Sequence, residues 1–91
     1  MLKVQYSGQF KKDFKRIKKR GLDLARLRFV IDELAHGNTL EPAYKDHCLT
    51  GDYASFRECH IQPDWLLIYR VDKDRLVLVA QRTGSHSDLF K

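Results

Sequence analysis

The chain has 91 residues and a mass of 10.7 kDa, which is near the lower size limit for a protein that buries its own core. Its composition, 43% hydrophobic with five Gly and two Pro, excludes collagen-like, linker-like and disordered chains. We therefore expect one domain over residues 1–91. The longest apolar runs, at residues 65–69 and 76–80, are far shorter than the roughly 20 residues of a membrane span, so we expect neither membrane insertion nor export.

The charge is concentrated in the first third of the chain. Residues 1–28 carry ten Lys or Arg against two acids, whereas residues 29–91 carry seven against ten. Such a basic field favours a polyanion such as nucleic acid, or an acidic protein partner. The alternative is a solvated helix face that is kept basic for solubility. Cys48 and Cys59 are too few for a disulfide scaffold, so we expect two free thiols in a cytoplasmic protein.

The N-terminal segment predicts a strand followed by a basic helix. Residues 2–6 alternate apolar with polar side chains, which is the period of a half-buried strand. Ser7 is a suitable N-cap for the helix that follows. The apolar face of this helix has i, i+4, i+7 spacing and lies opposite the lysines; it consists of Phe10, Phe14 and Ile17. Gly21 ends the pattern.

A second amphipathic helix is expected over residues 23–36, with Gly37 as its C-terminal cap. Phe29 lies outside its apolar face, so this ring either packs within the helical hairpin, which we favour, or faces a partner. Residues 38–51 have no sustained periodicity and predict a loop that enters a sheet.

Three strands are expected in the C-terminal half, over residues 53–61, 65–71 and 76–81, joined by tight turns. Residues 85–88 have the Ser-x-x-Asp form of a capping box and predict one short helical turn that ends at Phe90. The chain is therefore predicted to be an α+β protein. An N-terminal strand and a helical hairpin precede a three-stranded antiparallel meander, and the helices pack on one face of the sheet.

Five polar residues fall at boundaries between the predicted elements rather than within apolar runs. They are His47, His60, Asp64, Arg82 and His86. In an antiparallel pair joined by a short turn, the start of one strand lies beside the end of its neighbour. We therefore expect Asp64 and Arg82 to be close, with His60 at the same edge. Each residue alone would be an ordinary surface group, but their convergence at one end of one sheet indicates a functional site.

Histidines, a carboxylate and an arginine are the parts that RNA cleavage without a metal requires. One group removes the proton of the ribose 2′-OH, a second protonates the departing 5′ oxygen, and a fixed cation stabilises the charge that builds on the phosphate. Imidazole changes its charge near neutral pH, and the planar guanidinium binds two phosphate oxygens at once.

A zinc site built from His47-Cys48 and Cys59-His60 is the alternative chemistry at these positions. Neighbouring residues on a strand point to opposite faces, so Cys59 and His60 cannot easily bind one ion. No Cys-x2-Cys or His-x3-His spacing is present, and no Gly-rich phosphate loop. We therefore expect neither a metal nor a cofactor.

Four segments carry a resemblance to a known family. They are YSGQF at residues 6–10, DHCLTG at 46–51, RECHIQPDWLLIY at 57–69 and RTGSHSDLF at 82–90. With these motifs the chain closely resembles, over its whole length, the YafQ branch of the RelE/ParE toxin superfamily. Members of that branch are toxins of bacterial type II toxin-antitoxin systems, which enter the ribosomal A site and cut mRNA there.

The resemblance implies which residues form the active site. The implied catalytic set is His47, His60, Asp64, Arg82 and His86, and the implied supporting set is Trp65, Phe90 and Arg57. His86 would be the general acid, whereas His60, Asp64 and His47 all stay open as the general base.

The resemblance also implies the partners. We expect a cognate antitoxin, the ribosome and mRNA, with a toxin that is monomeric alone and hetero-oligomeric with its antitoxin. The basic residues of the first helix are expected to dock on ribosomal RNA; they are Lys11, Lys12, Lys15, Arg16, Lys18, Lys19 and Arg20. The alternative is a gyrase inhibitor like the ParE branch, which acts by binding and has no nuclease activity.

Overall fold

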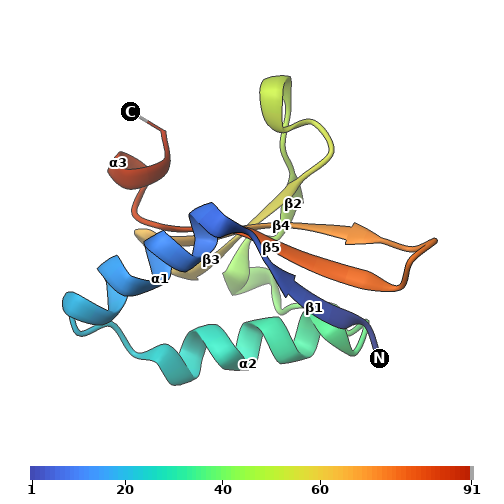
Figure 1. Cartoon of the computed structure of the whole chain (residues 1–91), viewed down its shortest axis with the longest axis horizontal. Coiled ribbons are helices and arrows are strands. Elements are labelled where there is room, and N and C mark those ends of the chain that lie inside the picture. Colours follow the sequence, from blue (N-terminus) through green and yellow to red (C-terminus); the bar gives the residue numbers. More distant parts are fainter. Residues whose placement is uncertain (91) are drawn as a thin grey trace.

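The computed structural model describes residues 1–90 and consists of one mixed sheet, two long helices and a short C-terminal helix (Figure 1). In chain order the elements are β1 (Lys3–Tyr6), α1 (Gly8–Lys19), α2 (Leu24–Ala35), the 3₁₀ turn η1 (Pro42–Tyr44), β2 (His47–Cys48), the 3₁₀ turn η2 (Gly51–Tyr53), β3 (Arg57–Gln62), β4 (Trp65–Asp72), β5 (Val77–Gly84) and α3 (His86–Leu89). The strand order is β1-β5-β4-β3-β2.

The predicted α+β class and the helical hairpin are confirmed, with two differences in the sheet. The sheet has five strands, because His47–Cys48 pairs with β3 as the short strand β2 inside the segment that was expected to be a loop. Two residues are too few to show a period of two in the sequence. In addition, β1 pairs with β5 in parallel, whereas the other neighbours are antiparallel.

The helix termini follow the local rules of capping. The Ser7 side chain accepts the backbone N–H of Phe10 at 2.9 Å and caps α1, and the Asp23 side chain accepts the N–H of Ala25 at 3.0 Å and caps α2. The predicted capping box at Ser85 is present and begins α3.

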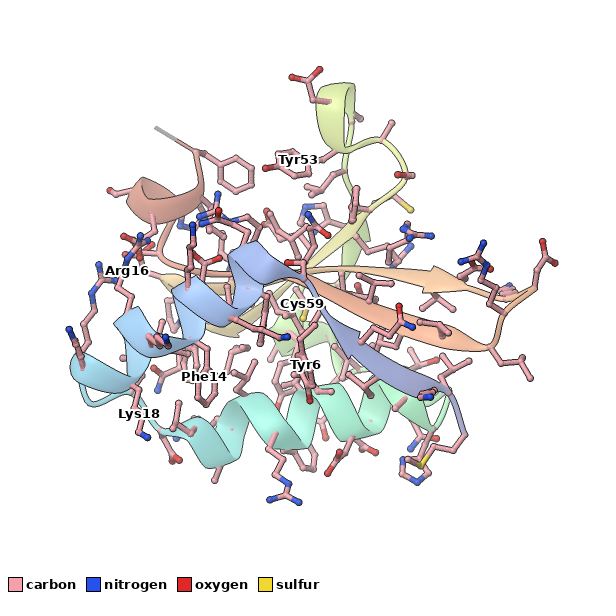
Figure 2. All side chains as sticks on the ribbon, viewed as in Figure 1. Tyr6, Phe14, Arg16, Lys18, Tyr53 and Cys59 are labelled. Atoms are coloured by element: carbon pink, nitrogen blue, oxygen red, sulfur yellow. The ribbon has the colours of Figure 1, made fainter. Side chains whose placement is uncertain are left out.

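The main core lies between the sheet and the two long helices. Cys59, Trp65, Leu67 and Tyr69 point from the sheet toward α1 and α2, and Figure 2 shows Cys59 in this layer. The expectation for Phe29 is wrong, because this ring is 52% exposed on α2. Because Phe29 lies outside the apolar face of α2, its ring faces solvent although it is hydrophobic.

The opposite face of the sheet carries a smaller apolar cluster, in which Leu66, Ile68 and Leu89 are buried. Glu58 and His60 alternate with Cys59 and Ile61, which belong to the helix-side core, so they lie on this second face. We call it the site face. Figure 1 shows α3 and the loop between β2 and β3 on the side of the sheet away from α2.

Helix α1 covers part of the outer edge of the sheet. Strand β1 pairs with β5 only as far as Ala80, where the chain turns into α1. The Ser7 hydroxyl then donates to the carbonyl of Gln81 at 2.7 Å. The remaining edge of β5 is thus satisfied by side chains of α1 rather than by another strand. Among the helices of residues 1–90, none is long and apolar enough to cross a membrane.

Candidate active site

His86 and Asp64 form the most direct contact of the candidate site. Asp64 lies in the turn between β3 and β4, and His86 is the first residue of α3. The backbone N–H of His86 donates to Oδ1 of Asp64 at 3.0 Å, and its ring Nδ1 lies 2.7 Å from the same oxygen. These contacts, first the backbone hydrogen bond and then the ring, hold the pKa of Asp64 below its ordinary value. Asp64 is therefore an anion that orients the His86 ring.

His60 has a carboxylate partner of its own, Glu58. Nε2 of His60 lies 3.3 Å from Oε1 of Glu58, and Nε2 of His47 lies 3.8 Å from the same oxygen. Glu58 is only 6% exposed, so its charge acts on both rings with little screening by water. His47 reaches Glu58 from β2, the strand that pairs with β3.

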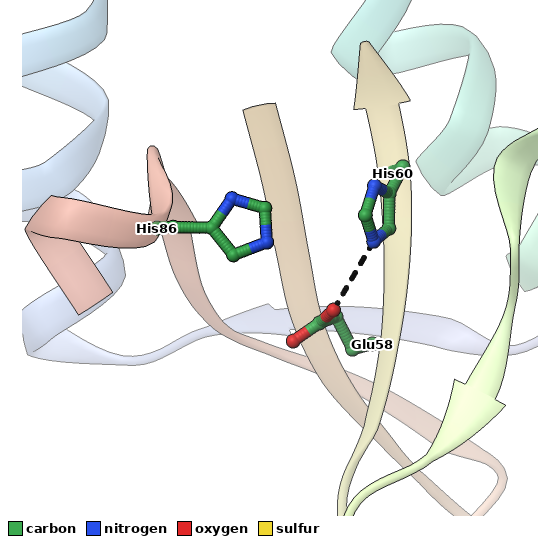
Figure 3. Close-up of side chains that lie close together, drawn as sticks. All are labelled: Glu58, His60 and His86. Carbon is green, nitrogen blue, oxygen red and sulfur yellow. Dashed lines mark ion pairs between the residues drawn. The ribbon is translucent and has the colours of Figure 1, made fainter. Parts of the chain in front are cut away.

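The two imidazole and carboxylate pairs converge. The rings of His60 and His86 are 5.7 Å apart between centroids and tilted by 65°. Figure 3 shows both rings approaching Glu58 from opposite sides. The site face thus brings together two histidines, each with its own carboxylate, from β3 and α3.

Arg82 reaches the site face because β5 is irregular. Ile68 of β4 pairs with Arg82, whereas the next residue, Tyr69, pairs with Ala80, so Gln81 is an extra residue. Strict alternation would place Arg82 on the helix side with Ala80, but the bulge returns it to the face of Ile68. Such bulges re-aim side chains near functional sites.

Arg82 does not contact Asp64 among the described interactions, although the sequence predicts that the two are close. Leu66 pairs with Gly84, so continuing the antiparallel register by two residues places His86, not Arg82, opposite Asp64. The guanidinium of Arg82 instead pairs with Asp13 of α1 through two hydrogen bonds of 2.9 and 3.0 Å. Asp13 is the main cause of the raised pKa of Arg82.

Helix α3 is fixed by a charged contact with α1. Nη1 and Nη2 of Arg20 donate to the Asp88 carboxylate at 2.6 and 2.9 Å, and Arg16 lies 3.6 Å from it (Figure 2). The Arg20 contact holds the pKa of Asp88 well below its ordinary value. A side chain at Gly84 would meet Asp88 at 2.9 Å, and Gly84 has a φ of 153°, so glycine is required there. Arg16 and Arg20 thus position the helix that carries His86.

Three aromatic rings lie beside the site on the same face. The ring of Tyr53 is 5.8 Å from that of Phe56 and 6.2 Å from that of Phe90, both edge-on (Figure 2 labels Tyr53). Phe90 is 43% exposed. Exposed rings at a nucleic-acid site are platforms on which bases stack.

Two of the residues implied as supporting lie elsewhere. Trp65 is in the helix-side core, where its indole N–H donates to the Thr83 hydroxyl at 2.9 Å. Arg57 turns toward Tyr69 and Asp46, and its pKa is raised first by the hydrogen bond with Tyr69 and then by Asp46. Both are odd-numbered neighbours of residues on the site face, so they point away from it.

The sequence reasoning missed Glu58, Asp13 and Tyr53. A signal existed for Glu58, because residues 58 and 60 share one face of a strand. A signal also existed for Asp13, which lies at helical spacing among Phe10 and Ile17 on the apolar face of a basic helix. Tyr53 carries no such pattern, since it is brought to the site by a loop.

The donor atoms of Glu58, His60 and His86 all lie within 4.8 Å of one another, so these side chains could hold a metal ion. Two imidazoles and one carboxylate suit borderline transition metals such as zinc or copper. The alternative zinc site of His47, Cys48, Cys59 and His60 does not form, because Cys59 points to the helix side of the sheet. Burial there raises the pKa of its thiol.

This geometry defines a class of protein: a small α+β protein whose sheet presents an acid-base site with a fixed arginine, of the kind that acts on phosphate esters. Comparison with known proteins narrows the class. The family model described as "Bacterial toxin of type II toxin-antitoxin system, YafQ" matches residues 2–91. The chain belongs to this toxin family.

Individual relatives agree with this assignment over nearly all of the chain. The mRNA interferase toxin YafQ of Escherichia coli strain K12 is 42% identical over 88 residues, which are 96% of this chain and 94% of the relative. A metal-bound toxin from Helicobacter pylori is 47% identical, with a TM-score of 0.93 over 99% of this chain and 100% of that one. YafQ in the Escherichia coli DinJ-YafQ complex is 37% identical, with a TM-score of 0.90 over 100% of both chains.

Proposed function

We propose that this toxin is an endoribonuclease that cuts mRNA in the ribosomal A site, using general acid and base catalysis by its own side chains. The observation that carries the proposal is the pair of histidines, His60 and His86, 5.7 Å apart and each beside its own carboxylate. The name of the Escherichia coli relative, an mRNA interferase, supports the same activity.

His86 is proposed as the general acid. Its Nδ1 faces the Asp64 carboxylate, which stabilises the protonated ring and leaves Nε2 to donate a proton to the departing 5′ oxygen. Asp64 acts as the partner that orients this ring rather than as the base, because its Oδ1 is already engaged by the backbone and ring of His86.

His60 is proposed as the general base that takes the proton of the ribose 2′-OH. The Glu58 carboxylate, 3.3 Å from Nε2, stabilises the imidazolium that forms during the transfer. His47 is more exposed and lies 3.8 Å from the same oxygen, so it is assigned a secondary part in the same charge network.

Arg82 is proposed to hold the scissile phosphate and to stabilise the charge that develops on it. It lies near the end of β5, and its side chain is mostly buried and paired with Asp13, so the guanidinium is fixed before the substrate arrives. Phe90 and Tyr53 provide exposed aromatic surface on which a base of the mRNA stacks.

The ribosome is proposed to supply the positioning that this small site lacks. The lysines of α1 are exposed and suit the backbone of ribosomal RNA; they are Lys11, Lys12, Lys15, Lys18 and Lys19. Holding two reactants in register lowers the barrier of the chemical step. Free RNA would therefore be cut slowly.

A single toxin domain over residues 1–91 is proposed to be cytoplasmic, monomeric alone and inhibited by a cognate antitoxin in a hetero-oligomer. The structure of an Escherichia coli relative in the DinJ-YafQ complex supports an antitoxin partner. An antitoxin that covers the site face would block mRNA directly.

The decisive experiment maps cleavage ends on one transcript with and without ribosomes, for the parent and for His86→Gln. The proposal expects ribosome-dependent cleavage that His86→Gln abolishes while the variant stays folded and still binds ribosomes. Equal cutting of free and translated RNA would refute ribosome dependence. Growth arrest that persists in His86→Gln, together with loss of gyrase supercoiling in a purified assay, would favour the gyrase-inhibitor alternative.

A further inference from the structure

Asp13 is an acid in an unusual place. It lies in the middle of α1, where its near neighbours in sequence are mostly lysines and arginines, and its side chain is fully buried. A buried carboxylate is retained only where it is paired and hydrogen-bonded. The partners of Asp13 therefore indicate what it is for.

Three donors converge on this carboxylate. Oδ2 accepts the Nε–H of Arg82 at 2.9 Å and the backbone N–H of Thr83 at 3.2 Å, and Oδ1 accepts from Nη2 of Arg82 at 3.0 Å. The N–H of Thr83 belongs to the part of β5 that β1 does not reach. Asp13 thus takes the place of a neighbouring strand and at the same time grips Arg82.

The backbone N–H of Thr83 needs an acceptor, but this need does not explain why the acceptor is charged. A neutral acceptor such as Ser or Asn satisfies one backbone N–H without bringing a charge into the protein interior. A charged group is explained by the arginine partners of Asp13. Nη1 of Arg16 lies 3.8 Å from Oδ1, too far for a hydrogen bond, whereas the two oxygens match the Nε and Nη2 edge of the Arg82 guanidinium.

The pairing leaves the other side of Arg82 available. A guanidinium has five N–H donors, and Asp13 uses one on Nε and one on Nη2. Asp13 does not use the two N–H groups of Nη1 or the second N–H of Nη2, and together they form the outer fork that binds two phosphate oxygens. Tyr53 lies near the guanidinium as well and, after Asp13, also raises the pKa of Arg82. The two hydrogen bonds to Asp13 hold the Arg82 side chain in one conformation.

We propose that Asp13 is a positioning residue for catalysis, which holds the Arg82 guanidinium so that its outer fork meets the scissile phosphate. The inference rests on the proposed function, in which Arg82 stabilises the transition state. Asp13 itself touches no substrate. It reduces the positive charge of the site and increases its order, so the two effects of its removal have opposite signs.

Asp13→Asn separates charge from position. The site gains one positive charge, which by electrostatics alone would tighten phosphate binding. If Asp13 positions Arg82, single-turnover cleavage of ribosome-bound mRNA falls about 10-fold or more, while the toxin concentration that half-saturates the ribosome is unchanged or lower. The matched control is Asp32→Asn, which removes an exposed acid from α2 and is expected to leave both quantities unchanged.

A double-mutant cycle distinguishes positioning from a merely structural role. Arg82→Ala is expected to be strongly impaired, and Asp13→Asn in that background should add little, because there is no guanidinium left to position. Full additivity of the two losses would overturn the inference. Full activity of Arg82→Ala would instead overturn the role of Arg82 in the proposed function, whereas a normal rate for Asp13→Asn beside an inactive Arg82→Ala would overturn the inference alone.

A measurement on the protein with Asp13 in place covers the outcome in which Asp13→Asn does not fold. In the His86→Gln variant, NMR relaxation of the Arg82 Nε–H group is expected to give an order parameter close to that of rigid backbone, about 0.85. The exposed Arg75, which has only an ion pair of 3.8 Å with Asp72, is the control and should be mobile. An Arg82 Nε–H group as mobile as that of Arg75 would overturn the inference.

Discussion

Asp64 accepts the backbone N–H of His86 and faces the ring of the same residue with one oxygen, Oδ1, at 3.0 and 2.7 Å. The backbone contact fixes where α3 begins, and the ring contact fixes how its first side chain points. A single carboxylate therefore couples the start of a helix to the orientation of the proposed acid.

Replacement of this carboxylate by its amide tests the coupling. Asp64→Asn keeps an oxygen for the backbone N–H but removes the anion that stabilises a protonated ring. We expect the cleavage rate at neutral pH to fall about 10-fold or more. Single-turnover rates on ribosome-bound mRNA measure the loss.

Asp74→Asn is the matched control, since it removes an exposed acid from the turn between β4 and β5. A single-turnover rate of Asp64→Asn equal to that of the parent would show that the carboxylate charge has no part in the action of His86.

Most of the fold follows from rules that act over a few residues. The alternation before Ser7, the spacing of Phe10 and Ile17, and the capping box at Ser85 each predict a local conformation that tertiary contacts then keep. The parallel pairing of β1 with β5 and the two-residue strand β2 depend on long-range contacts, which a periodicity of the sequence does not contain.

The candidate site, like the fold, could be predicted only where local rules place its residues. His60 and Asp64 could be predicted as neighbours because they lie on either side of the end of β3, at one end of the sheet. The partner of Arg82 could not be predicted in this way, because the bulge at Gln81 shifts the register by one residue and Asp13 comes from 69 residues earlier in the chain. One residue of register decides which face a strand side chain occupies.

Acidification should weaken the attachment of α3. The pKa of Asp88 is held well below its ordinary value by Arg20, so this pair contributes stability above the ordinary aspartate pKa of about 4 and loses it as the pH falls toward the lower folded-state pKa. We expect Asp88→Asn to lower the free energy of unfolding at pH 5 and to lose less stability than the parent on going to pH 2. Denaturant titrations in the His86→Gln background measure this difference.

The same substitution should also affect catalysis. Because Asp88 joins α3 to α1, its loss misplaces His86, and we expect the cleavage rate of Asp88→Asn to fall about 3-fold to 10-fold. Unfolding curves of parent and variant that stay a constant distance apart from pH 5 to pH 2 would contradict the role of the carboxylate charge.

Transition metals are expected to inhibit the enzyme. An ion held by Glu58, His60 and His86 would engage the rings of both the proposed acid and the proposed base and displace them from their catalytic roles. Addition of zinc or copper to a ribosome cleavage assay should lower the rate, and a chelator should restore it.

Glu58→Gln provides the control for metal binding. It removes the charged ligand, so calorimetry on the isolated protein should show weaker binding of zinc than in the parent. Stimulation of the parent by either metal would contradict the inhibitory reading of this cluster.

The basic residues of α1 should separate into two groups with different functions. Arg16 and Arg20 pair with Asp88, whereas Lys12, Lys15 and Lys19 are exposed and have no ion pair among the described residues. We expect the triple change of these lysines to Glu to weaken ribosome binding. Each phosphate contact that is lost should reduce the slope of log affinity against log salt by about 0.7 to 0.9.

The matched variant is Arg16→Gln with Arg20→Gln, which removes positive charge from the same helix but from the contact with α3. Since those arginines already face a carboxylate, this variant should keep most of the salt slope and lose cleavage rate through the misplacement of His86. Ribosome affinity is measured by sedimentation at several salt concentrations, with cleavage in parallel. An unchanged slope for the lysine variant would mean that its lysines form a solvated face, and an equal loss of slope in both variants would place Arg16 and Arg20 on RNA as well.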